Sequence, residues 1–273
     1  MTTTRRTLWA HGTAALLALT VLLAGCASSR PSQPPPPPPV PQAPEIRVGI
    51  TLDSPPFVMQ EGQQISAVGI EVDFAKRLSF DLKRPLRVIA LTWNELIPAL
   101  VNGQIDIIMS GMTITRLRSM RVAFSEPYMD SGLSVLIRNN LGDAYQTPAQ
   151  ALGGSLRVGV TRGTTADTYV TQNYRGGQVF PYLSNSDGVA DLVQSRIDAF
   201  VTDAPTVAWY ASVHDGTLRP LIRPLLTQEQ IGWGFRPQDD DLRAAANASL
   251  ANWKADGFVD RTIKRWIPLY KAR

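Results

Sequence analysis

Short apolar runs alternate with stretches of helical periodicity from residue 45 onward. Between Glu71 and Leu82 apolar residues recur at helical spacing, and Pro85 ends this helix before the apolar run Leu86 to Leu91. A further run, Ile105 to Met109, is short, rich in β-branched residues and bounded by turn residues, which favours a buried parallel strand. This alternation predicts an α/β fold in which helices cover a sheet.

An internal repeat divides this pattern into two copies. Arg47-Val-Gly-Ile-Thr51 recurs as Arg157-Val-Gly-Val-Thr161, and Leu100-Val-Asn-Gly-Gln-Ile-Asp106 recurs as Leu192-Val-Gln-Ser-Arg-Ile-Asp198. Each copy predicts a strand, a helical stretch, then a helix, a turn and a second strand. Repeats this short also arise by chance, so two related α/β lobes are a hypothesis at this point.

Small polar residues and one arginine follow the predicted strand that ends at Met109. They are Ser110, Gly111, Thr113, Thr115 and Arg118. The glycine allows backbone to approach a ligand, the threonines supply hydroxyl groups or helix caps, and the guanidinium lies one helical turn further on. This set predicts a carboxylate-binding subsite at the carboxyl end of an open sheet. A solvated arginine on a capped surface helix is the alternative.

A second helix is predicted between Asn94, as its N-cap, and Gly103, which ends it. Its core residues are Leu96, Ile97 and Leu100. Trp93 directly precedes this cap, in a strand-to-helix loop at the same edge of the sheet as Ser110. Two interpretations fit Trp93, a hydrophobic staple and a flat wall for a ligand side chain.

The run GMTITRLRSMRVAFSEPY, residues 111–128, resembles the characteristic motif of extracellular solute-binding protein family 3. This family comprises amino-acid-binding lipoproteins and periplasmic proteins that supply ABC importers. Similar motifs follow the family's order at residues 69–75, 93–100, 162–165 and 201–203. The resemblance implies an α/β fold of the type II periplasmic-binding-protein kind, with two lobes that each contain a mixed sheet flanked by helices.

The resemblance also implies how the chain is divided. Residues 45–131 and 235–273 are expected to form lobe 1, and residues 132–234 lobe 2. Two glycine-containing stretches, 131–137 and 231–236, are expected to cross between the lobes as a hinge. The tail returns to lobe 1 as a helix from Asp239, interrupted at Gly257, and a second short helix to Trp266. Its expected core residues are Leu242, Ala246, Leu250 and Trp253.

The family's site residues match positions in both lobes. In the family, the position of Arg118 binds an α-carboxylate, and that of Asp203 binds an α-ammonium. Thr113 and Thr165 are expected to add hydrogen bonds, and Trp93 is expected to be a wall of the site. Gly111, Ser54 and Thr51 complete the expected ligand-binding set. For Asp203, which the repeat places where Gly111 lies in the first copy, the alternative is an N-cap of the helix after it.

Two positions depart from the family pattern and bear on the ligand. Ser54 stands where many members have an aromatic residue, and Thr51 stands where binders of basic amino acids have an acid. A cationic side chain therefore lacks its usual partner, which favours a polar uncharged or an aromatic amino acid. Arg162 has two interpretations, a partner for an acidic side chain and a solvated cation.

The first 44 residues predict export and anchoring. Residues 1–25 carry Arg5 and Arg6, an apolar run and then small residues, as a secretory signal peptide does. Leu23-Ala-Gly-Cys26 resembles a lipobox, in which Cys26 is lipidated, and the paired arginines also resemble a twin-arginine signal. Residues 26–44 contain nine of the chain's 21 prolines and predict a semi-rigid polyproline spacer, with a PxxP ligand as the alternative.

Composition argues against several other functions. The formal net charge of +4 falls by two once the signal peptide with its two arginines is removed, which gives no argument for nucleic-acid binding. A single cysteine allows no intrachain disulfide, and His214 is the only histidine after residue 26. Metal sites and Ser-His-Asp chemistry therefore have few residues to draw on, and we expect no metal and no cofactor.

The sequence therefore predicts an exported, lipid-anchored and monomeric receptor. It is expected to close two lobes on an α-amino acid, without catalysis, and to deliver it to an ABC permease. An enzyme similar to cyclohexadienyl dehydratases is the first alternative, with Asp167 where such an enzyme places an acid. A ligand-sensing lipoprotein that signals to a partner is the second.

Overall fold

The computed structural model describes residues 43–62 and 66–268. The predicted signal peptide, Cys26 and nearly all of the proline-rich spacer lie outside these residues. The strands are β1 (Ile46–Ile50), β2 (Asp53–Ser54), β3 (Val58–Glu61), β4 (Ser66–Val68), β5 (Leu86–Ala90), β6 (Ile107–Ile108), β7 (Ala123–Phe124), β8 (Met129–Ser131), β9 (Leu133–Arg138), β10 (Val158–Thr161), β11 (Val179–Tyr182), β12 (Ala199–Asp203), β13 (Leu218–Leu221), β14 (Glu229–Ile231) and β15 (Gly234–Phe235). The helices are α1 (Ile70–Leu82), α2 (Trp93–Val101), α3 (Arg116–Ser119), the 3-10 helix η1 (Asn139–Ala144), α4 (Pro148–Gly153), α5 (Thr165–Asn173), α6 (Asn185–Val193), α7 (Ala204–Val213), α8 (Asp240–Ala255) and α9 (Phe258–Trp266).

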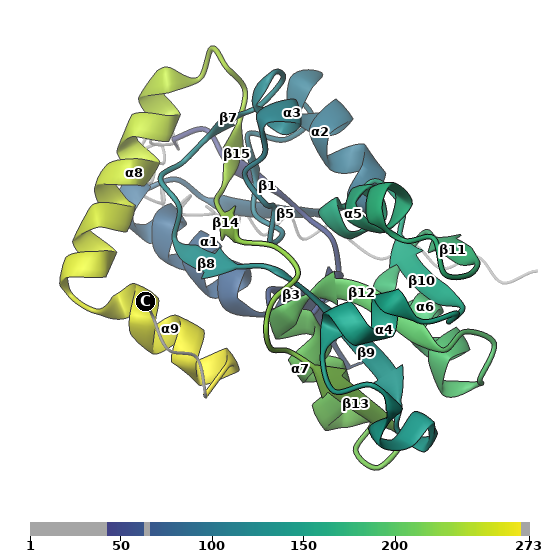
Figure 1. Cartoon of the computed structure of the whole chain (residues 1–273). Helices are drawn as coiled ribbons and strands as arrows, with labels where there is room; N and C mark the ends of the chain where they lie inside the picture. The colour runs from purple at the N-terminus through teal and green to yellow at the C-terminus, as the bar shows by residue number, and fades with distance from the viewer. Residues whose placement is uncertain (1–42, 63–65, 269–273) are drawn as a thin grey trace, which may run out of the picture. The chain divides into compact units, whose positions relative to one another are not determined.

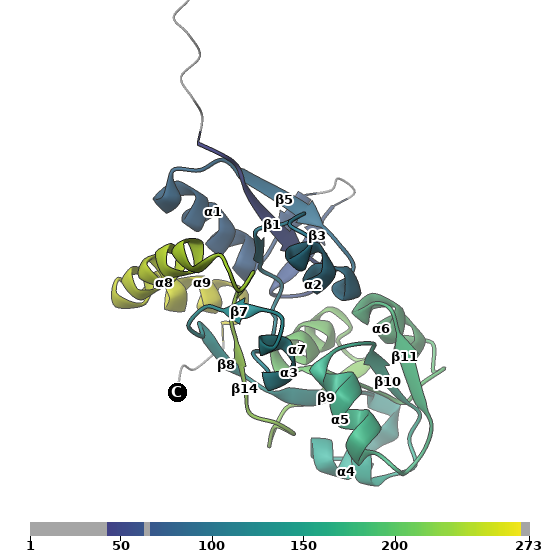
Figure 2. The same cartoon turned by 90° about the horizontal axis from the view of Figure 1, so that it is seen from above.

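The first sheet has the strand order β5-β1-β6-β15-β7. Strand β1 is parallel to β5 and β6, whereas β15 is antiparallel to β6 and β7, so the sheet is mixed. Helices α1, α8 and α9 pack on one face and α2 on the other (Figures 1 and 2). Neighbouring residues of β6 serve opposite faces, because Ile107 joins the cluster with α1 and Ile108 joins the cluster with α2.

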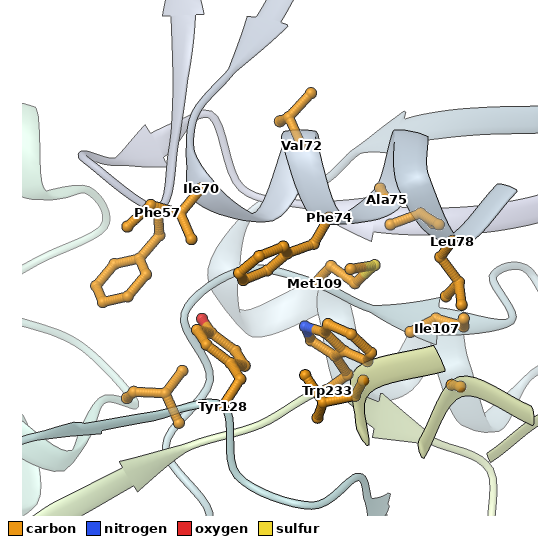
Figure 3. Packing of buried hydrophobic residues seen from close by; sticks show 14 of the residues in the cluster. Phe57, Ile70, Val72, Phe74, Ala75, Leu78, Ile107, Met109, Tyr128 and Trp233 are labelled. Carbon is orange, nitrogen blue, oxygen red and sulfur yellow. The ribbon is translucent and has the colours of Figure 1, made fainter. Parts of the chain in front are cut away.

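An aromatic cluster fixes the C-terminal helices to the first sheet. The ring centroid of Phe74, on α1, lies 5.3 Å from that of Tyr128 and 6.0 Å from that of Trp233 (Figure 3). It also lies 5.9 Å from the ring centroid of Trp253. Trp233 and Trp253 are fully buried. Since these four residues come from widely separated parts of the chain, their packing holds together the segments before and after the second sheet.

The second sheet has the order β11-β10-β12-β9-β13, with β10 parallel to β11 and β12, and β9 antiparallel to β12 and β13. Helices α4 and α5 pack on one face, and α6 and α7 pack on the other. The predicted α/β architecture with two mixed sheets and flanking helices is confirmed.

The internal repeat corresponds to a shared structural unit. In the first sheet Asp106 accepts hydrogen bonds from the backbone amide of Arg47 at 2.9 Å and from its Nη2 at 2.6 Å. In the second sheet Asp198 accepts from the amide of Arg157 at 3.0 Å and from its Nη2 at 2.9 Å. Each pair joins the start of one parallel strand to the turn before its neighbour. The repeated arginine and aspartate therefore fix the same strand pairing twice.

The predicted hinge stretches are wrong in their extent. Residues 133–138 form β9, inside the second sheet, and residues 234–235 form β15, inside the first. Strands β8 and β14, which precede β9 and β15 respectively, form a separate antiparallel pair outside both of these sheets, and β2, β3 and β4 form a further small sheet. Close packing also requires a glycine at position 132, because a Cβ on Gly132 would lie 2.1 Å from the carbonyl oxygen of Thr227.

The predicted cap of the second helix is also wrong. Helix α2 has Thr92 as its N-cap, and Asn94 lies inside its first turn. The Glu95 carboxylate accepts hydrogen bonds from the Thr92 amide at 2.9 Å and from the Thr92 hydroxyl at 2.7 Å. This capping-box arrangement starts the helix two residues earlier than a side-chain cap from Asn94 would. The helices predicted after Asp239 are confirmed as α8 and α9.

Candidate ligand-binding site

A cavity of about 370 Å³ lies where parallel strands of both sheets end. The first sheet contributes the residues after β1 and β6, and the second contributes the ends of β10 and β12. All eight residues predicted to bind ligand line this cavity: Thr51, Ser54, Trp93, Gly111, Thr113, Arg118, Thr165 and Asp203. Its size and mixed polar and apolar walls suit a small molecule.

Arg118 is positioned by the short helix α3. The Thr115 hydroxyl caps this helix and accepts a hydrogen bond from the Arg118 amide at 3.2 Å. The guanidinium donates from Nη1 to the carbonyl of Thr113 at 2.8 Å, and its Cζ lies 5.1 Å from the centre of the Trp93 ring. Burial lowers the pKa of Arg118, whereas Asp203 and Glu229 raise it. The arginine is therefore a half-buried cation beside two carboxylates, and not a solvated surface residue.

Asp203 ends β12 and precedes helix α7, yet its side chain makes no capping hydrogen bond. Its Oδ1 is buried without a hydrogen-bond partner among the described residues. The pKa of Asp203 is raised to about 7: burial is the largest cause, the nearby Glu229 adds to it, and Arg118 opposes both effects. A buried carboxylate oxygen of this kind needs a donor, which a ligand can supply.

The backbone after β6 comes close to the cavity. Gly111 has a φ of 65°, and a Cβ there would lie 2.9 Å from the Phe57 ring. Its amide donates to the buried carboxyl of Glu71 at 2.6 Å, and the Tyr128 hydroxyl donates to the same group at 2.6 Å. Burial raises the pKa of Glu71 to about 8, although both hydrogen bonds lower it. Glu71 thus holds the loop that carries Thr113.

Trp93 and Arg118 reach across the cavity to the other sheet's residues. The indole Nε1 of Trp93 donates to the carbonyl of Gly163 at 3.1 Å, and Nη2 of Arg118 lies 3.5 Å from the same oxygen. Gly163 belongs to the predicted turn between β10 and α5, where Thr164 caps the helix by accepting from the Asp167 amide at 3.2 Å. Trp93 therefore lines the cavity and also connects the residues beside the first sheet with the turn after β10 of the second sheet.

Asp53 makes a second contact across the cavity, which sequence reasoning did not find. Its carboxylate accepts from the backbone amides of Asn185 and Ser186, at the start of α6, and Asn185 Nδ2 donates to its carbonyl at 2.8 Å. Burial raises the pKa of Asp53, and the hydrogen bonds from Ser186 and Asn185 lower it. In the sequence, the acid two residues before Pro55 is the feature that could have drawn attention to this position. Its partners could not be predicted, because they lie more than a hundred residues away along the chain.

Glu229, on β14, was also missed. Its Oε2 accepts hydrogen bonds from the hydroxyls of Thr113 at 2.8 Å and Thr165 at 3.2 Å, and its Oε1 accepts from Thr227 at 2.8 Å. The two threonines thus share one carboxylate oxygen that belongs to the segment between the sheets. The sequence gives no local signal for this contact.

Two other candidates lie away from the cavity. Asp167 accepts from the Gly163 amide at 2.9 Å and so shapes the turn, and Arg162 is exposed. Across residues 43–62 and 66–268, no cluster of three histidine, cysteine or acidic residues is placed to hold a metal ion. Within the same residues, no helix is both long and apolar enough to cross a membrane.

Known proteins resemble this chain over most of its length. The family model for bacterial extracellular solute-binding proteins, family 3, matches residues 46–268. The ABC transporter arginine-binding protein 1 of Escherichia coli (strain K12) is 28% identical over 229 residues, which are 83% of this chain and 92% of that protein. A mutant of ArgBP from T. maritima has a TM-score of 0.75 and 33% identity, over 82% of this chain and 95% of its own.

A second solved structure is equally similar in fold. It is an ancestral amino-acid-binding protein described as a precursor of cyclohexadienyl dehydratase, with a TM-score of 0.75 and 31% identity, over 81% of this chain and 95% of its own. The fold of this chain is therefore that of the type II periplasmic amino-acid-binding proteins.

Proposed function

The chain belongs to the bacterial extracellular solute-binding proteins, family 3, and we propose that its cavity holds an α-amino acid as a zwitterion between Asp203 and Arg118. Like its relatives, it captures an amino acid outside the cytoplasm for an ABC importer. The observation that carries the proposal is the buried Oδ1 of Asp203, which has no hydrogen-bond partner in the described part of the chain and belongs to a residue of the cavity that Arg118 also lines. An α-ammonium supplies the missing donor, and an α-carboxylate meets the guanidinium.

We further propose that the side chain of this amino acid is cationic. The lining residues include three acids, Asp53, Glu95 and Asp203. After Asp203 and Arg118 pair with the zwitterion, Asp53 and Glu95 leave further negative charge in the cavity wall. The arginine-binding relative supports this choice. This proposal replaces the expectation of a polar uncharged or an aromatic amino acid. That expectation rested on Thr51 and Ser54 alone and did not take into account the acids that other residues contribute to the cavity.

Calorimetric titration with arginine, lysine, glutamine and phenylalanine tests the proposed ligand class. Glu95→Gln is expected to weaken binding of arginine by about threefold and to leave glutamine unaffected, because the lost charge is exposed to solvent. The substituted glutamine still caps α2, as the capping-box rule allows. Glu61→Gln, an exposed acid on β3, is the matched control. Equal wild-type affinity for arginine and glutamine would contradict the cationic ligand and leave amino-acid binding standing.

We propose that the protein binds its ligand without chemical turnover. Its named relative is a binding protein, and Asp167, the residue considered for catalysis, is engaged by the Gly163 amide outside the cavity lining. Incubation with prephenate and arogenate, followed by product analysis, distinguishes this function from that of a dehydratase. Release of phenylpyruvate or phenylalanine by the purified protein would favour the enzyme.

We also propose that residues 1–25 are removed and that Cys26 carries the lipid anchor. The hydrophobic run, the lipobox and the absence of any other cysteine in the sequence support this assignment. Cys26→Ser is expected to release the protein from membranes, as detergent phase partition measures, without changing ligand affinity. The reason is that the anchor and the cavity are separated by the proline-rich spacer. A variant that stays in the detergent phase would exclude the lipobox.

A further inference from the structure

Glu229 holds two threonines that line the cavity from different sides. Thr113 follows β6 of the first sheet, and Thr165 begins α5 beside the second sheet. Both hydroxyls lie within hydrogen-bond distance of the same oxygen, Glu229 Oε2, at 2.8 and 3.2 Å. The other oxygen, Oε1, accepts from Thr227, two residues earlier on the same segment. The Glu229 carboxylate therefore accepts hydrogen bonds from three threonine hydroxyls on three separate segments.

These contacts fix where the hydroxyl protons point. An ionised carboxylate only accepts hydrogen bonds, and a threonine hydroxyl has a single proton to donate. Because Thr113 and Thr165 both give that proton to Glu229, their oxygens offer only lone pairs to the cavity. The sequence predicted Thr113 to belong to a carboxylate-binding subsite, where its hydroxyl would donate, whereas the contact with Glu229 leaves that oxygen as an acceptor.

The charges around Asp203 and Arg118 also favour a ligand group that is positively charged. Glu229 and Asp203 act on one cation, Arg118, and Glu229 also acts on Asp203. Two carboxylates against one guanidinium leave an excess of negative charge. A protonated amine has several N–H donors for acceptors such as Asp203 Oδ1, which has no partner among the described residues, and the threonine oxygens, whereas a hydroxyl group has one proton to donate and a carbonyl group has none.

Building on the proposed amino-acid site, we infer that Glu229 is a specificity-determining positioning residue that makes this end of the cavity select a protonated amine. It does so through Thr113 and Thr165, whose protons it holds, and through its own charge. Glu229 itself is not among the residues that line the cavity, so its effect on a ligand is indirect.

The test compares an amine with its hydroxyl analogue. L-arginine and argininic acid, its 2-hydroxy counterpart, are titrated by calorimetry against wild type, Glu229→Gln and the control Gln230→Ala. Gln230 is the exposed neighbour of Glu229 on β14 and contacts Asp130 at 3.3 Å. Glu229→Gln is expected to reduce the preference for arginine over argininic acid by about tenfold, because a neutral amide with its own donors no longer fixes both protons. The control is expected to keep the wild-type preference.

A double-mutant cycle separates this role from a merely structural one. If the threonine acts through its oriented proton, Thr113→Val is expected to reduce the preference in wild type and to change it much less in the Glu229→Gln background. Equal weakening of both ligands by Glu229→Gln, or an unchanged preference, would overturn the inference while the amino-acid site stands. Failure of wild type to bind any of the tested amino acids would instead contradict the proposed function.

Discussion

Arg118→Ala is expected to raise the dissociation constant for the amino acid by roughly a hundred- to a few thousandfold, which corresponds to about 3 to 5 kcal/mol. The substitution leaves the ligand's α-carboxylate without its cation in a cavity that Asp203 lines and that Glu229 lies close behind. The remaining charges then repel the carboxylate. Calorimetry with the best ligand from the amino-acid series measures this loss.

The control for this variant is on the same helix. Arg116→Ala removes an exposed charge from α3 and is expected to bind as wild type does. Since Arg118 also donates to the Thr113 carbonyl and lies over Trp93, the thermal unfolding of the variant must be measured beside its affinity. A folded Arg118→Ala protein with wild-type affinity would show that the arginine does not bind the ligand.

The part of the site that the sequence predicted is local in the chain. Gly111, Thr113 and Arg118 follow one strand within ten residues, and the strand's apolar pattern indicates where that strand ends. Because parallel strands in such sheets present their carboxyl ends to a common edge, a polar segment directly after a strand is a sound predictor of a site. The repeat extended this prediction to the second sheet, where Arg157 and Asp198 reproduce the pairing of Arg47 with Asp106.

The part that the sequence did not predict depends on contacts between distant residues. Glu229 meets Thr113 from 116 residues away, and Asp53 meets Asn185 from 132 residues away. Neither acid belongs to a local sequence pattern that indicates its partner. Each contact forms only because the two sheets pack on either side of one cavity. The misplaced helix cap is different, since Thr92 and Glu95 already formed a readable capping-box pattern in the sequence.

This difference also explains the change in proposed ligand. The expectation of an uncharged ligand side chain came from two single positions, Thr51, which lacks an acid, and Ser54, which lacks an aromatic ring. The cavity is instead bounded by side chains from separate elements, so its charge is a property of the assembled walls, to which Asp53, Glu95 and Asp203 contribute. Local departures from a family pattern therefore inform about ligand charge only when the surrounding acids are known.

Removing the ligand's ammonium group is expected to weaken binding to wild type by at least roughly a hundredfold, because closure then buries the Asp203 carboxylate without a partner. The measurement is a titration with an amino acid and its 2-oxo or 2-hydroxy analogue. Asp203→Asn is expected to narrow this gap, since a neutral amide tolerates the analogue better. Equal affinity of wild type for the amino acid and its analogue would show that Asp203 does not pair with the ligand's ammonium group.

The same residue predicts how affinity depends on pH. Burial and Glu229 place the pKa of Asp203 near 7 in the empty site, and a bound ammonium stabilises the ionised form, so binding releases a proton at lower pH. Affinity is therefore expected to rise with pH up to about 7, by no more than about tenfold per unit, and then to level off. Calorimetry in buffers of different ionisation enthalpy detects the released proton. In Asp203→Asn the profile between pH 5 and 8 is expected to be flat, and a wild-type profile equally flat would mean that this carboxylate is already ionised before the ammonium arrives.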